Sequence, residues 1–89
     1  NPAPHIFVSS YAYNVFIKFK EIFKEDKNQL ANYSFIYRIM QKENLIHEKT
    51  NQINFIEFLA KNNIHLDRIK TLNSIGNLAY KKEIYKNCK

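Results

Sequence analysis

The sequence predicts an all-α domain of four to five short helices in a compact orthogonal bundle, with a helix-turn-helix-like C-terminal half. Apolar residues recur at intervals of three and four along most of the chain, which is the spacing of one buried helix face. The chain has one Gly and two Pro, both Pro near the N-terminus, so it lacks the turn residues of a multi-strand sheet. Hydrophobic residues are 45% of the 89 residues and aromatic residues 15%, enough for a single core.

Residues 1–9 are expected to form an extended arm before the first helix. Pro2 and Pro4 keep their neighbours out of helical backbone, and the apolar residues 6–8 suit a short strand. Ser9 or Ser10 then supplies an N-cap. A helix over residues 10–26 follows, because one apolar stripe runs through it: Ala12, Val15, Phe16, Phe19, Ile22 and Phe23. The first residue is Asn rather than Met, so residues 1–89 are expected to be one domain that a longer parent protein can contain.

A second helix is predicted over residues 29–43, with Asn44 at its C-terminal end. Its apolar residues cover much of its circumference, and such a helix is usually central in a domain. They are Leu30, Tyr33, Phe35, Ile36, Tyr37, Ile39 and Met40. The apolar residues 45–47 that follow form either a single extended segment or a continuation of the packing.

The C-terminal half is predicted to contain three short helices. Thr50 or Asn51 caps the first, over residues 51–61, and Asn62–Asn63 ends it, because Asn tolerates the left-handed backbone of a tight turn. A helix over residues 66–74 follows, with Leu66, Ile69 and Leu72 buried. A last helix covers residues 77–86. Two short amphipathic helices joined by a tight polar turn are the arrangement of a helix-turn-helix.

This arrangement predicts that helix 66–74 enters the major groove of DNA. Arg68 would pair with a guanine edge and Asn73 with an adenine. Phosphate contacts would come from lysines around the helix. The full predicted set of nucleic-acid-binding residues is Lys61, Arg68, Lys70, Thr71, Asn73, Lys81 and Lys82.

The charge distribution favours a nucleic-acid partner for the C-terminal half. The chain has a net charge of +6, and residues 45–89 hold eight basic and four acidic side chains against six and four in residues 1–44. A genome rich in A/T codons would also supply many lysines and asparagines. The alternative is therefore a protein-interaction or dimerisation module, in which a Tyr/Phe surface meets a protein partner or a second copy in a homodimer.

No enzymatic activity is predicted. The chain has no Gly-rich phosphate loop and no serine elbow, and its three histidines lack metal-ligand spacing, so no catalytic residue, cofactor or metal is expected. The single cysteine, Cys88, cannot form an intrachain disulfide, which favours a reducing, cytoplasmic location. No window approaches the roughly 20 apolar residues of a membrane span, so no membrane partner is expected.

Parts of the chain resemble small uncharacterised bacterial helical domains, similar to the helical C-terminal parts of regulators carried on mobile elements. The resemblance covers most of residues 6–75 and departs from helix-turn-helix families at Leu59, where Ala or Gly is usual, and at Asn63, where Gly is frequent. It implies a regulatory or mobile-element context without catalytic residues. The residues that carry it are Tyr33-Ser34-Phe35-Ile36-Tyr37-Arg38-Ile39-Met40, Leu45-Ile46-His47, Phe55, Phe58-Leu59 and Leu66-Asp67-Arg68-Ile69-Lys70-Thr71-Leu72.

Overall fold

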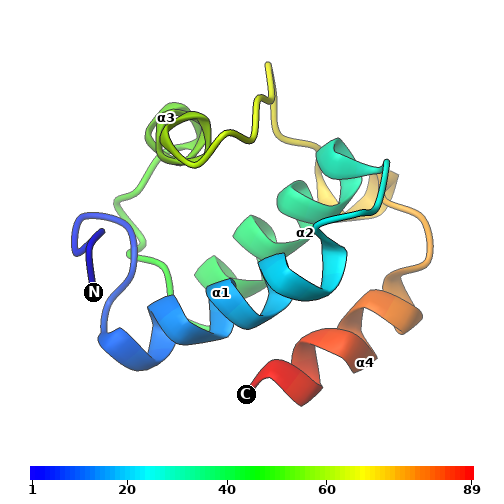
Figure 1. The fold of residues 1–89 in the computed structure, drawn as a ribbon, viewed down its shortest axis with the longest axis horizontal. Coiled ribbons are helices and arrows are strands. Elements are labelled where there is room, and N and C mark those ends of the chain that lie inside the picture. Colours follow the sequence, from blue (N-terminus) through cyan, green and yellow to red (C-terminus); the bar gives the residue numbers. More distant parts are fainter.

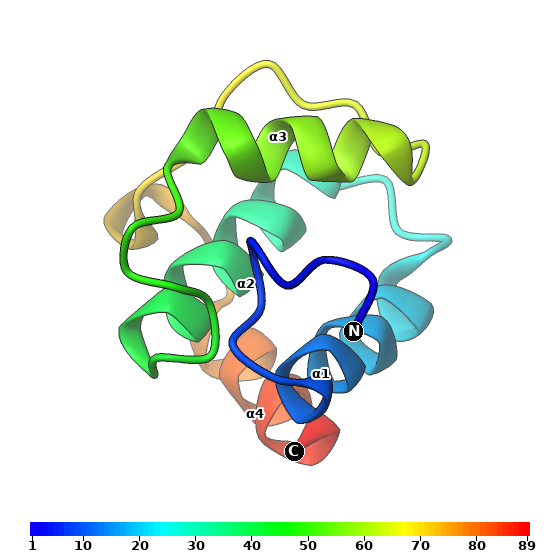
Figure 2. The ribbon, with the colours of Figure 1, turned by 90° about the vertical axis from the view of Figure 1, so that its left-hand side faces the viewer.

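Three α-helices and one 3₁₀ turn surround a fourth, central helix in a computed structural model that describes residues 1–89. In chain order they are α1 (Ser10–Phe23), α2 (Gln29–Lys42), α3 (Gln52–Lys61), the 3₁₀ turn η1 (Leu72–Ser74) and α4 (Leu78–Cys88). α1 and α4 lie side by side and antiparallel, whereas α3 crosses above them on the opposite side of the molecule (Figures 1 and 2). Figure 1 shows α3 end-on and α1 from the side, so the bundle is orthogonal. The predicted all-α class is confirmed.

α1 starts where the sequence predicts and ends three residues early. Ser9 is the N-cap, and its hydroxyl oxygen accepts a hydrogen bond from the backbone N–H of Ala12 at 3.1 Å. After Phe23 the chain turns, and Asp26 accepts hydrogen bonds from residues at the start of the next helix. Its carboxylate accepts from the N–H of Asn28 at 2.7 Å, and its carbonyl accepts from the side chain of Gln29 at 2.6 Å.

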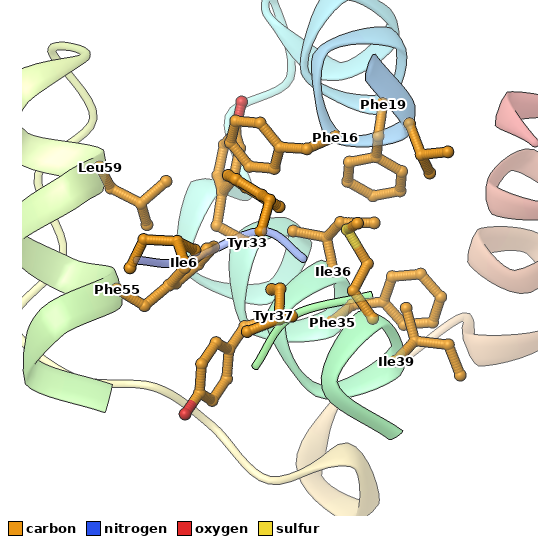
Figure 3. Packing of buried hydrophobic residues seen from close by; sticks show 14 of the residues in the cluster. Ile6, Phe16, Phe19, Tyr33, Phe35, Ile36, Tyr37, Ile39, Phe55 and Leu59 are labelled. Atoms are coloured by element: carbon orange, nitrogen blue, oxygen red, sulfur yellow. The ribbon is translucent and has the colours of Figure 1, made fainter. Parts of the chain in front are cut away.

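α2 is buried on several sides at once, as its broad apolar surface predicts. Figure 3 shows its side chains pointing toward α1, where Phe16 and Phe19 lie, and toward α3, where Phe55 and Leu59 lie. The helix ends before Asn44, which has the left-handed φ of 64°. Asn63, after α3, also has a φ of 64°, so both asparagines end helices as expected.

The N-terminal arm is part of the core. A turn at residues 4–6 folds it back, and Phe7 then pairs with Ile46 in an antiparallel β-bridge. Val8 N–H donates to the carbonyl of Leu45 at 3.1 Å, and His47 N–H donates to the carbonyl of Ile6 at 3.0 Å. Of the two possibilities for residues 45–47, the extended segment is therefore confirmed, and the bridge fastens the arm to the end of α2.

The predicted helix over residues 66–74 is wrong. Only Leu72–Ser74 are helical, as one 3₁₀ turn, and the preceding residues follow an irregular path over α2. The backbone of Lys70 is bonded to side chains of α2: its N–H donates to the hydroxyl of Ser34 at 2.9 Å, and its carbonyl accepts from Nε of Arg38 at 3.1 Å. These bonds replace the bonds to i−4 and i+4 that an α-helix needs, and an isolated helix of this length is marginal on its own.

The last helix, predicted over 77–86, is α4 (Leu78–Cys88). Asn77 precedes it with a left-handed φ of 57°. None of the helices combines the length and the apolar character that crossing a bilayer requires.

One buried polar residue of α2 generates a stability prediction. Asn32 is 0% exposed, and neither its side-chain oxygen nor its nitrogen has a hydrogen-bond partner in the protein. Burying an unpaired amide costs about 1–3 kcal/mol. Replacing Asn32 by Leu, whose side chain has the same number and branching of heavy atoms, should raise the free energy of unfolding by about 1 kcal/mol, measured by urea denaturation. Asn54→Leu, at an exposed position of α3, is the control and should change stability little; a loss of stability in Asn32→Leu would contradict the prediction.

Candidate nucleic-acid interface

The structure does not bring the predicted nucleic-acid-binding residues together on one helix. Lys61 ends α3, on the opposite side of the molecule from α4 (Figure 2). Arg68 and Asn73 are exposed on the irregular segment before α4, and Lys70 between them is half-buried. No recognition helix carries these side chains, so the predicted insertion of residues 66–74 into a major groove as a helix has no structural basis.

Thr71 has a local structural role. Its hydroxyl lies 3.2 Å from the hydroxyl of Ser74, and its carbonyl accepts from the N–H and the hydroxyl of Ser74 at 3.1 and 3.0 Å. These bonds close the 3₁₀ turn. The polar character that suggested base contacts at this position is therefore used within the turn.

Lys81 is buried, contrary to its predicted contact with phosphate. The residue is 6% exposed, and its ammonium nitrogen lies 5.9 Å from the centroid of the Phe23 ring. The long aliphatic stem of lysine allows it to pack in this way against an aromatic residue. Lys82, the next residue, is exposed, so it is the one residue of the predicted set on α4 that a ligand can reach.

A basic groove lies between α4 and the C-terminal half of α2. It has a volume of about 430 Å³, and its lining residues are Ile39, Glu43, Lys82, Tyr85, Lys86 and Lys89. The three lysines are spaced four and three residues apart, so they share one face of α4. We call these six residues the α4 groove. Lys86 and Lys89 were absent from the predicted set, although their helical spacing from Lys82 is visible in the sequence.

Glu43 is the one carboxylate in the α4 groove, and two groups from α4 bind it. The hydroxyl of Tyr85 donates to its Oε1 at 2.6 Å, and the ammonium of Lys89 lies 2.9 Å from the same oxygen. Burial acts to raise the pKa of Glu43, but the hydrogen bonds from Tyr85 and Lys89 bring this pKa below its usual value. Burial, together with the hydrogen bond to Glu43, raises the pKa of the Tyr85 hydroxyl. Lys82 and Lys86 form no ion pair, so both keep their charge free for a ligand.

Neither a metal site nor a known relative defines the function further. The structure has no group of three or more His, Cys, Asp and Glu side chains placed to hold a metal ion. Comparisons with protein-family models, with curated proteins and with solved structures find no match to this chain. The assignment of a function therefore depends on the chemistry of the surface.

The Glu43 pair predicts a pH-dependent contribution to stability. A carboxylate with a lowered pKa in the folded state stabilises the fold above its unfolded pKa, near 4.5, and this contribution is lost as pH falls through the folded value. Because the pair is partly exposed, we expect Glu43→Gln to lower the free energy of unfolding by only about 0.5 kcal/mol at neutral pH.

In urea denaturation, the difference between the original chain and Glu43→Gln at neutral pH should shrink as the pH is lowered below 4.5 and through the folded-state pKa of Glu43. Glu48→Gln removes an exposed carboxylate that has no ion pair and serves as the control. If the difference in free energy of unfolding between the original chain and Glu43→Gln stays the same as the pH is lowered, the prediction is contradicted.

Proposed function

We propose that this protein binds the phosphate backbone of nucleic acid through the α4 groove. The observation that carries the proposal is the stripe of Lys82, Lys86 and Lys89 along one face of α4, with a single carboxylate among them that is already paired. Lys42, next to Glu43 at the end of α2, adds a further exposed positive charge. Such a surface attracts polyanions by releasing their condensed counterions.

The dimensions of the stripe suit a nucleic-acid strand. Lys82 and Lys89 are seven residues apart, which is about 10 Å along a helix axis. One strand of a duplex presents a phosphate about every 3.4 Å along its axis, but the backbone also winds around that axis, so a straight stripe of this length can contact about two phosphates of one strand. Contacts of this kind position a protein on nucleic acid but do not specify a base sequence. We therefore propose binding without strong sequence preference.

The aromatic residues favour a duplex over a single strand. Proteins that bind single strands stack bases on exposed aromatic rings. The aromatic ring in the α4 groove is that of Tyr85, which is only 3% exposed. Tyr80 is exposed, but its position two residues before Lys82 places it on the other side of α4. The basic face of α4 therefore has no exposed aromatic ring on which a base could stack.

Binding to a labelled random-sequence duplex of roughly 20 base pairs, measured by fluorescence anisotropy, tests the proposal. With phosphate contacts from the two unpaired lysines, Lys82 and Lys86, the logarithm of the association constant should fall against the logarithm of salt concentration with a slope near −2. Lys82→Gln with Lys86→Gln should reduce that slope by about 2 and weaken binding at about 50 mM salt at least tenfold.

The matched control is Lys27→Gln with Lys61→Gln, which removes the same charge from two exposed lysines outside the α4 groove. This double variant should keep most of the binding and most of the slope. Equal losses in the two double variants would show that net charge alone drives binding, and the proposal would be abandoned. It would also be abandoned if the original chain shows no salt-dependent binding.

A role as a DNA-binding regulator in the cytoplasm, the setting that the sequence resemblance implies, is part of this proposal. Arg68 and Asn73 are its remaining candidates for base contacts, since both are exposed. They lie on a segment that η1 and the bonds of Lys70 fix to α2. Any base contact would therefore come from an irregular segment rather than from a helix.

A second candidate function, self-association, is supported by a mainly apolar groove between α1 and α4. Its volume is about 450 Å³, and its lining includes Ile17, Ile22 and Cys88. Ile22 is 53% exposed and lines this groove beside Ile17 and Cys88. The residues that line this groove belong to α1 and α4, which lie side by side and antiparallel (Figure 1). We propose a second copy of the chain as its occupant, because closed dimers are the commonest oligomers.

Sedimentation velocity over a range of protein concentrations tests self-association. The original chain should form a growing fraction of dimer, and Ile22→Glu should remain monomeric because a buried charge in the interface is unfavourable. Ile53→Glu, at a position of α3 that is 65% exposed, is the matched control and should dimerise as the original chain does. A chain that stays monomeric at all concentrations, or equal effects of the two substitutions, would exclude this role.

A further inference from the structure

We infer that Glu43 sets how tightly the α4 groove binds a polyanion, because it holds Lys89 in an ion pair that an incoming phosphate has to break. The inference rests on the proposed nucleic-acid binding and concerns regulation of that same groove. Glu43 is the C-cap residue of α2, whereas Lys82 and Lys86 lie on α4 and Lys89 is its C-cap residue, so the packing of the two helices creates the arrangement. Glu43 would act as a built-in competitor for the phosphate.

The carboxylate of Glu43 lies among several positively charged side chains and lowers the net charge of the groove. The groups that face it are Lys42 beside it on α2, and Tyr85 and Lys89 on α4, with Lys82 and Lys86 lining the same groove. The lining residues carry three positive charges and one negative charge. Removing the negative charge therefore raises the net charge of the groove by half, from +2 to +3. The potential at the phosphate position rises accordingly.

The geometry of Lys89 shows that the ion pair and a phosphate compete for the same ammonium group. Its nitrogen lies 2.9 Å from Oε1 of Glu43 and 5.0 Å from the centroid of the Tyr85 ring. The ammonium is thus directed toward the groove wall. The side chains of Lys89 and Glu43 are 34% and 38% exposed, so a phosphate can reach the pair. Without Glu43, Lys89 would be free to contribute one more phosphate contact.

Two substitutions separate the charge of Glu43 from its structural contact with Tyr85. Glu43→Gln removes the charge but keeps a side-chain oxygen that can accept from the Tyr85 hydroxyl at its present place, 2.6 Å from Oε1. Tyr85→Phe removes the hydroxyl and leaves the carboxylate and its pair with Lys89 in place. The inference attributes the effect on binding to the charge, so only the first substitution should tighten binding.

The test measures duplex binding by anisotropy at several salt concentrations. Glu43→Gln should bind about three- to tenfold more tightly at about 50 mM salt, and its salt slope should be steeper by about 1. Tyr85→Phe should not tighten binding, because it removes no charge from the groove. Glu48→Gln, at an exposed position outside the groove, makes the same change in net charge and should have much less effect.

The possible outcomes distinguish a failure of the inference about Glu43 from a failure of the proposed function. If Glu43→Gln and Glu48→Gln tighten binding equally, or if Tyr85→Phe tightens it as much as Glu43→Gln does, the inference is overturned and the proposed function stands. If the original chain binds and only Glu43→Gln binds more tightly with a steeper salt slope, the inference is supported. If no variant binds, the proposed function fails and the inference fails with it.

Discussion

The fold depends on aromatic packing around α2, which meets each of the other three helices through aromatic residues. Tyr33 lies 6.2 Å from Phe16 of α1, and Tyr37 lies 4.9 Å from Phe55 of α3, between ring centroids. Phe35 lies 6.3 Å from Tyr85 of α4. Because these contacts point in different directions, α2 fixes the positions of its neighbours independently of one another. The α4 groove is one consequence, since the same packing that buries Tyr85 places Lys82, Lys86 and Lys89 beside Glu43.

Local chemistry explains which helices the sequence predicts correctly. α1 and α3 begin at capping side chains of Ser9 and Asn51, and each has an apolar stripe of helical period. Residues 66–74 have compatible apolar spacing too, yet no helix forms there. The deciding bonds come from Ser34 and Arg38, which are 36 and 32 residues away from Lys70 in the chain. A pattern confined to the segment contains no signal for such bonds, and a short helix has little intrinsic stability to oppose them.

The candidate site also combines local features, which the sequence predicts, with tertiary contacts, which it does not predict. The helical spacing of Lys82, Lys86 and Lys89 is a local feature, and it predicts one basic face of α4 as soon as that helix is recognised. The burial of Lys81 against Phe23 and the contact of Glu43 with Tyr85 and Lys89 are products of tertiary packing. The number of lysines in the sequence therefore overstates the number of positive charges that a ligand can reach. One lysine of the predicted set is hidden, and another basic residue, Lys89, is already paired.

Because residues 66–74 do not form a recognition helix, the molecule supports a different kind of nucleic-acid binding from the one that the sequence predicts. A helix inserted into the major groove presents several side chains to base edges in fixed register, which provides specificity. In the proposed binding mode the exposed lysines of α4 would contact a phosphate backbone instead, and Arg68 and Asn73 lie on a separate segment. Contacts with phosphates are sensitive to salt and indifferent to sequence, so small changes in local charge control their strength. In such a site a single carboxylate has unusual influence, because a phosphate backbone offers no base-specific hydrogen bonds to compensate for it.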